Sequence, residues 1–108
     1  MKHASTRILS GLAALAFFLA FSIPAHAQGA ESTYKGKCAA CHSADGTGSA
    51  MGKKMGARDF HSPDVQKQSD ADLTAAIAKG KNKMPSYEKS LKPEDIQGLV
   101  AYIRTFGK

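Results

Sequence analysis

Cys38-Ala39-Ala40-Cys41-His42 is the segment that decides the fold of this 108-residue chain, because it holds both cysteines and places a histidine directly after them. On a helical turn, residues three and four positions apart share one face. Both thiols and the imidazole are therefore expected to point towards a single flat ligand. Two thiols at this spacing suit thioether bonds to two vinyl groups, and the adjacent imidazole suits a metal at the ligand's centre. The pattern is typical of a c-type haem attachment site.

Three other interpretations of the segment are weaker. A thioredoxin-like redox pair would follow a strand within a βαβ unit, but no strand pattern precedes Cys38. A zinc site needs four ligands, and His61 is the only further histidine beyond residue 27. A pair of cysteines buried as small apolar side chains is the third interpretation. Covalent haem c remains the favoured cofactor.

The first 27 residues have the pattern of a secretory signal peptide. A positively charged start, an almost wholly apolar run over residues 8–23 and the small residues of Ala25-His26-Ala27 follow one another in the order that signal peptides use. The apolar run is shorter than the roughly 20 residues that span a bilayer. We predict cleavage after Ala27, which leaves residues 28–108 as a soluble periplasmic domain. An uncleaved membrane anchor is the alternative.

The composition indicates that a bound group completes the core. With 43% apolar and 22% charged residues, the chain is neither fully disordered nor fibrous. A domain this small buries only about 60% of its unfolded surface and usually needs a staple or a bound group. The chain has no tryptophan and only 7% aromatic residues. Its net charge of +6 admits acidic partners, but the lysines are neither clustered nor interleaved with aromatics, so nucleic acid is not expected.

Three main helices are expected, without strands or internal repeats. The first covers about residues 30–40. The second opens after Ser69, whose side chain can cap it, and ends at Gly80, where a left-handed residue suits a helix terminus. The third begins at Pro93 and ends at Gly107, with apolar residues at helical spacing.

The intervening residues 43–65 are rich in Gly, Ser and Lys and are expected to have little regular structure. The predicted fold class is therefore all-α with long loops.

A methionine is the expected second iron ligand, because methionine opposite histidine is the cytochrome c arrangement. Met84 is the best candidate, since Pro85 restricts its backbone to an extended conformation just after the second helix. Met51 and Met55 lie close behind the haem-binding turn and are expected to be flexible core residues. His61 is a rival ligand, although a surface histidine is the favoured interpretation.

These motifs resemble the small class I c-type cytochromes, which are exported, single-haem bacterial electron carriers. The resemblance covers nearly all of the chain after the leader. It rests on Ala30, Tyr34, Cys38-x-x-Cys41-His42, Asp45-Gly46-x-Gly48, Met84-Pro85 and Leu99-Val100-Ala101-Tyr102-Ile103. It implies a cytochrome c fold around one haem, with the first and last helices crossing through Ala30, Tyr34, Leu99 and Tyr102. It also implies thioether bonds to the haem at Cys38 and Cys41, and axial iron ligands at His42 and Met84.

The resemblance implies a one-electron carrier and not an enzyme. Iron held by His42 and Met84 has no vacant position for a substrate, so neither bond-making chemistry nor a small-molecule substrate is expected. We expect a monomer whose partners are redox proteins with acidic docking surfaces. The attracting residues would be Lys53, Lys54, Lys79, Lys81, Lys83 and Lys89. The main alternative is a haem-based sensor with a displaceable Met84; a peroxidase and a permanent subunit of a larger complex are further ones.

Two positions depart from the family pattern. The family usually has a proline in the loop after the histidine, whose neighbouring carbonyl holds the imidazole N–H, but residues 50–54 contain none. Another backbone carbonyl in that loop is therefore expected to orient His42. Lys92 occupies the expected N-cap of the last helix, where Ser or Thr would serve better.

Overall fold

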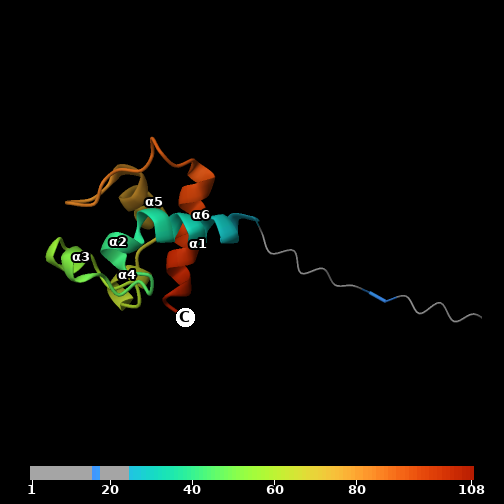
Figure 1. Ribbon diagram of the computed structural model, residues 1–108, viewed down its shortest axis with the longest axis horizontal. Helices are drawn as coiled ribbons and strands as arrows, with labels where there is room; N and C mark the ends of the chain where they lie inside the picture. Colours follow the sequence, from blue (N-terminus) through green and yellow to red (C-terminus); the bar gives the residue numbers. More distant parts are fainter. Residues whose placement is uncertain (1–15, 18–24) are drawn as a thin grey trace, which may run out of the picture.

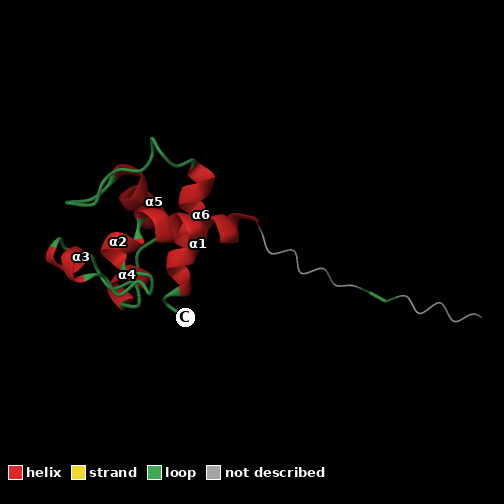
Figure 2. Ribbon diagram, in the orientation of Figure 1, coloured by secondary structure: helices red, strands yellow, loops and turns green. Residues whose placement is uncertain are grey.

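The computed structural model describes residues 16–17 and 25–108 and contains helices and loops but no strand within them (Figure 2). The helices are α1 (Ala25–Lys37), α2 (Ala39–His42), α3 (Ala50–Lys54), α4 (Pro63–Gln66), α5 (Asp70–Lys79) and α6 (Pro93–Thr105). This arrangement confirms the predicted all-α class. Most of the predicted leader, residues 1–15 and 18–24, lies outside the described part of the chain. None of the described helices is long and apolar enough to cross a membrane.

Helices α1 and α6 cross near their middles and form the centre of the fold (Figure 1). Ala30, Tyr34 and Leu99 are all buried at the crossing, the last two with only 1% of their surface exposed. The rings of Tyr34 and Tyr102 lie 5.0 Å apart between centroids and are tilted by 54°. The small side chain at position 30 lets the two backbones approach, and the aromatic rings fill the space beside it. The crossing expected from the sequence is confirmed.

The predictions for the N-caps of α5 and α6 are both confirmed. Ser69 accepts a hydrogen bond from the Asp72 N–H at 3.0 Å and so caps α5. Lys92 makes no side-chain cap at α6. Instead the Asp95 carboxylate accepts a hydrogen bond from the Lys92 N–H at 3.0 Å, so an acid inside the first turn compensates for the poor N-cap residue.

Two of the sequence predictions need correction. The first helix ends at Lys37, not near residue 40. The chain tightens at Cys38, whose carbonyl accepts hydrogen bonds from both the Cys41 and His42 N–H groups before α2 completes the turn. Residues 43–65 also contain more regular structure than expected, namely α3 and α4. Each of these is a single turn, too short for a helical repeat of apolar residues to appear in the sequence.

Candidate functional site

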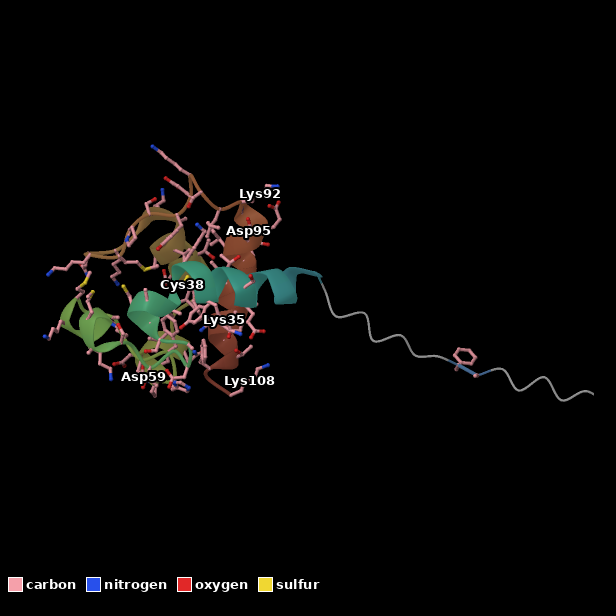
Figure 3. All side chains as sticks on the ribbon, in the orientation of Figure 1. Lys35, Cys38, Asp59, Lys92, Asp95 and Lys108 are labelled. Atoms are coloured by element: carbon pink, nitrogen blue, oxygen red, sulfur yellow. The ribbon has the colours of Figure 1, made fainter. Side chains whose placement is uncertain are left out.

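The four predicted haem-binding residues, Cys38, Cys41, His42 and Met84, all line one cavity. Cys38, labelled in Figure 3, follows α1 directly and is the N-cap of α2, and Cys41 and His42 lie in α2. The fourth comes from the loop after α5, which extends towards the side of the molecule where α3 lies (Figure 1). Apolar walls are supplied by Phe60, Val65, Leu73, Ala76 and Tyr87. The cavity is also lined by the basic residues Lys37, Arg58, Lys81 and Lys83.

Helix α3 packs directly on the back of the turn that carries Cys38, Cys41 and His42. Gly52 is buried there, and a Cβ at this position would overlap the Cys41 carbonyl group. The Ser49 hydroxyl donates to the Ala40 carbonyl at 2.9 Å and accepts from the Gly52 N–H at 2.9 Å, while the Ser49 N–H donates to the Cys41 carbonyl. The turn carrying both cysteines is therefore fixed from behind by backbone contacts.

Tyr34 and Ser43 close the other end of this turn. The Tyr34 hydroxyl donates a 2.6 Å hydrogen bond to the Ser43 carbonyl. Ser43 has φ 62° and ψ 158°, a region that non-glycine residues rarely adopt. The hydrogen bond helps to hold this strained residue immediately after His42.

The protonation state of His42 suits metal binding. Burial lowers the pKa of His42, which favours the neutral imidazole that binds metals. Burial also raises the pKa of the Cys38 thiol, with Lys37 opposing the shift. The two cysteines are not joined in a disulfide in this structure, so both thiols face the cavity as free groups.

The expected carbonyl partner of His42 is not found. Its Nδ1 is buried and has no hydrogen-bond partner among the described residues. Instead, the imidazole stacks on the ring of Phe60, with 4.5 Å between centroids and 22° between planes. The prediction that a backbone carbonyl orients this histidine is therefore wrong in this structure, since no carbonyl of the described residues accepts a hydrogen bond from its Nδ1.

Met84 sits in a loop closed by its own backbone. The Lys81 N–H donates to the Met84 carbonyl at 3.2 Å, and the Met84 N–H donates to the Lys81 carbonyl at 2.9 Å. Gly80 has φ 77°, as the sequence predicts, but its ψ of 167° lies outside the left-handed helical region. A Cβ at Gly80 would lie 2.5 Å from the Met84 carbonyl oxygen, so the loop needs glycine for space as well as for conformation.

Tyr87 ties the loop of Met84 to both adjacent helices. Its N–H donates to the Ile77 carbonyl at the end of α5, and its hydroxyl donates to the Lys37 carbonyl at the end of α1, at 3.2 Å. Tyr87 was not predicted from the sequence, since its only signal there is an isolated aromatic residue shortly after Met84.

The other candidate ligands lie elsewhere. Met51 and Met55 are not core residues, because 66% and 38% of their surfaces are exposed; Met55 lines the cavity at its α3 wall. The interpretation of both as core residues is wrong, because α3 turns that part of the chain outward. His61 lies at the surface, as expected, and its Nδ1 pairs with Asp59 Oδ1 at 2.7 Å.

The donor set fits a covalently bound haem. Two thiols, one imidazole and the thioether sulfurs of Met55 and Met84 line a cavity whose other walls are largely apolar. None of the described residues that line it is a carboxylate, the ligand type that hard cations prefer. The close approaches at Gly52 and Gly80 fix the backbone on the two sides of this cavity.

Comparisons with known proteins agree with this geometry. The family described as "Cytochrome C oxidase, cbb3-type, subunit III" matches residues 25–103. The chain is 34% identical to cytochrome c6 of Nostoc sp. over 110 residues, covering 95% of this chain and 92% of that relative. It is 36% identical to cytochrome c6 of Bryopsis maxima over 75 residues, covering 65% of this chain and 80% of the relative.

The fold has a close match among solved structures. The KustC0563 c-type cytochrome superposes with a TM-score of 0.70 at 32% identity, covering 73% of this chain and 98% of that protein. The chain belongs to the family of small, single-domain c-type cytochromes, which transfer electrons through a covalently bound haem c.

Proposed function

We propose that the chain is a soluble periplasmic one-electron carrier in which Cys38 and Cys41 hold the haem by thioether bonds and His42 and Met84 are the axial iron ligands. The observation that carries the proposal is that these four side chains, which come from two separate segments of the sequence, line the same cavity. When bound, the haem supplies the reversible Fe(III)/Fe(II) couple that accepts and releases one electron.

The residues of the chain set the properties of this couple. His42 presents a neutral imidazole because burial lowers its pKa. A methionine sulfur opposite histidine raises the reduction potential. With both axial positions taken by side chains, no position is left for a substrate. The protein is accordingly not an enzyme in this proposal, and the sensor alternative requires that Met84 be easily displaced.

Absorption spectra of the holoprotein in both redox states test the ligands. We expect the bands of a thioether-linked haem and, in the oxidised form, the weak far-red band of a sulfur–iron bond. Met84→Ala should remove the far-red band and lower the reduction potential, whereas Met51→Ala, at an exposed methionine, should change neither. Binding of carbon monoxide to the reduced wild-type protein at neutral pH would favour the sensor instead.

Basic residues around the cavity are proposed to guide acidic redox partners. Lys81 and Lys83 are exposed and line the cavity next to Met84. Neither forms an ion pair with a described residue, so their charge is available for long-range attraction. Lys53 and Lys54 are exposed on α3.

Electron-transfer rates with an acidic redox partner protein test this surface. We expect the second-order rate to fall steeply with ionic strength. Lys81→Glu with Lys83→Glu should lower the rate at low salt and flatten its salt dependence. Lys108→Glu, which reverses one charge at the exposed C-terminus away from the cavity, should have a smaller effect than Lys83→Glu alone. Equal effects of these two single reversals would remove the basis for docking at the cavity.

The proposed cleavage of the leader and the proposed monomeric state can each be measured directly. The mass of the protein purified from a host competent in export and haem attachment should correspond to residues 28–108 plus one haem. A mass that still includes residues 1–27 would support the membrane-anchor alternative. Elution as a single-copy species in size-exclusion chromatography is expected for the monomer.

A further inference from the structure

His42 lacks the hydrogen bond that usually orients a metal-bound histidine. Such histidines almost always donate their second ring N–H to a carboxylate, a carbonyl or water, but His42 Nδ1 has no partner among the described residues. The rotation of an imidazole about its last side-chain bond is broad and is not fixed by rotamer preference alone. No side chain or backbone group of the described residues therefore fixes the plane of this ring through a hydrogen bond.

The ring of Phe60 lies where it can fix the plane of the His42 imidazole. It is 8% exposed and stacks on the imidazole at 4.5 Å, with the two planes within 22° of parallel. This is the closest and most nearly parallel of the aromatic pairs in the described part of the chain. A flat neighbour at this distance leaves the imidazole little freedom to rotate.

Phe60 is itself held on both sides of its peptide. Its N–H donates to the Gly46 carbonyl at 2.9 Å, and its carbonyl accepts from Gln66 Nε2 at 2.7 Å. The same amide nitrogen also lies 3.1 Å from the Ile103 carbonyl on α6, and Arg104 Nη1 donates to the Gln66 carbonyl at 2.9 Å. Gln66 thus connects the backbone of Phe60 to the last helix.

We propose that Phe60 is the positioning residue for the axial histidine, fixing the imidazole plane by stacking where the family uses a hydrogen bond to a carbonyl. Gln66 supports this role by fixing the Phe60 backbone. The inference rests on the proposed function, since it assumes that His42 binds the haem iron. It adds that the orientation of this ligand depends on an aromatic contact from the loop between α3 and α4.

The test compares two aromatic residues of one cluster in the holoprotein. Phe60→Leu removes the stacking face. Phe106→Leu removes a similar volume from a ring that contacts Phe60, Tyr34 and Tyr102, but it does not remove the ring stacked on His42. The readouts are the hyperfine-shifted haem-methyl resonances of the oxidised protein, which report the orientation of the axial ligands, and the reduction potential.

We expect Phe60→Leu to alter the spread of the haem-methyl resonances and to shift the reduction potential. Phe60→Tyr, which keeps an aromatic ring at this position, should keep the wild-type pattern. Phe106→Leu should reduce thermal stability but leave the pattern unchanged. Gln66→Met, which keeps the Phe60 ring, should give a smaller change in the same direction and serves if Phe60→Leu does not fold. Wild-type patterns in Phe60→Leu, or in Gln66→Met if the former fails to fold, would overturn the proposal.

These outcomes are distinct from failure of the proposed function. If His42 is not an iron ligand, the wild-type protein itself will lack the spectrum of a histidine-bound haem before any variant is compared. If the ligand is present and Phe60 does not position it, only the comparison of variants will fail.

Discussion

The two sides of the cavity are built differently. On the His42 side, α2 and α3 are in direct backbone contact, with Gly52 against Cys41 and Ser49 bonded to both neighbouring turns. On the Met84 side, an exposed loop is closed by a pair of backbone hydrogen bonds with Lys81. The His42 side can change only if packed helices move apart. The Met84 loop is tied to α5 and α1 by Tyr87, but the segment before Tyr87 can rearrange without moving a helix.

From this difference we infer which property of the protein each side of the cavity controls. Damage on the His42 side should prevent the protein from folding around its haem. Damage on the Met84 side should leave a folded holoprotein with an altered ligand and potential. The predictions that follow test this separation.

The largest effect is expected when the group between the two sides is removed. Cys38→Ala combined with Cys41→Ala prevents covalent attachment, and the apolar walls of the cavity then lack the group they pack against. We expect the haem-free protein to lose most of its helical circular dichroism, because the stability of a small domain is only about 5–15 kcal/mol. A haem-free form with cooperative unfolding and native helix content would contradict this prediction.

Gly52→Ala should be the most damaging single change on the His42 side. The added Cβ would overlap the Cys41 carbonyl, which is backbone and cannot move without displacing the haem-binding turn. We expect a loss of about 3 kcal/mol in the free energy of unfolding and a low yield of holoprotein. Gly36→Ala is the matched control, because its added Cβ would meet nothing within 4 Å beyond its chain neighbours and the backbone of its own helix. It should stabilise α1 by about 0.5–1 kcal/mol.

Gly80→Ala makes the corresponding change on the Met84 side. It places a Cβ 2.5 Å from the Met84 carbonyl oxygen and forces alanine into φ 77°. We expect a loss of about 2 kcal/mol, together with a weakened far-red band and a lower potential in a haem-containing product. If Gly80→Ala blocked holoprotein formation as strongly as Gly52→Ala, the proposed separation of the two sides would be wrong.

Tyr34→Phe should give the smallest effect, and one that depends on pH. At neutral pH the variant loses the hydrogen bond to the Ser43 carbonyl, at a cost of about 1 kcal/mol. Burial raises the pKa of Tyr34 above its ordinary value. Above pH of about 10 the unfolded chain therefore releases this proton while the folded protein keeps it, and wild-type stability falls by up to about 1.4 kcal/mol per pH unit.

The variant lacks this titration, so the difference in stability between the two proteins should shrink as the pH rises above about 10. Denaturant unfolding of both holoproteins at neutral and alkaline pH measures it. A constant difference across that range would contradict the assigned role of the buried hydroxyl.

Much of the fold was predictable because its signals are local. The cap at Ser69, the proline at the start of α6 and the helical spacing of Ile96, Leu99 and Val100 each act within one or two turns of the chain. The short helices α3 and α4 were not predicted, because a single turn has no repeat and depends on contacts such as that between Gly52 and Cys41.

By itself, the sequence determined the class of cofactor and the residues proposed to hold it, because the spacing of Cys38, Cys41 and His42 is a property of one helical turn. Only the tertiary structure decided how these residues are supported. Phe60 reaches His42, and Gln66 reaches Ile103, through contacts between distant segments that no local pattern encodes. The physical reason is that a turn limits which side chains share a face, whereas the surroundings of that face depend on how the whole chain packs.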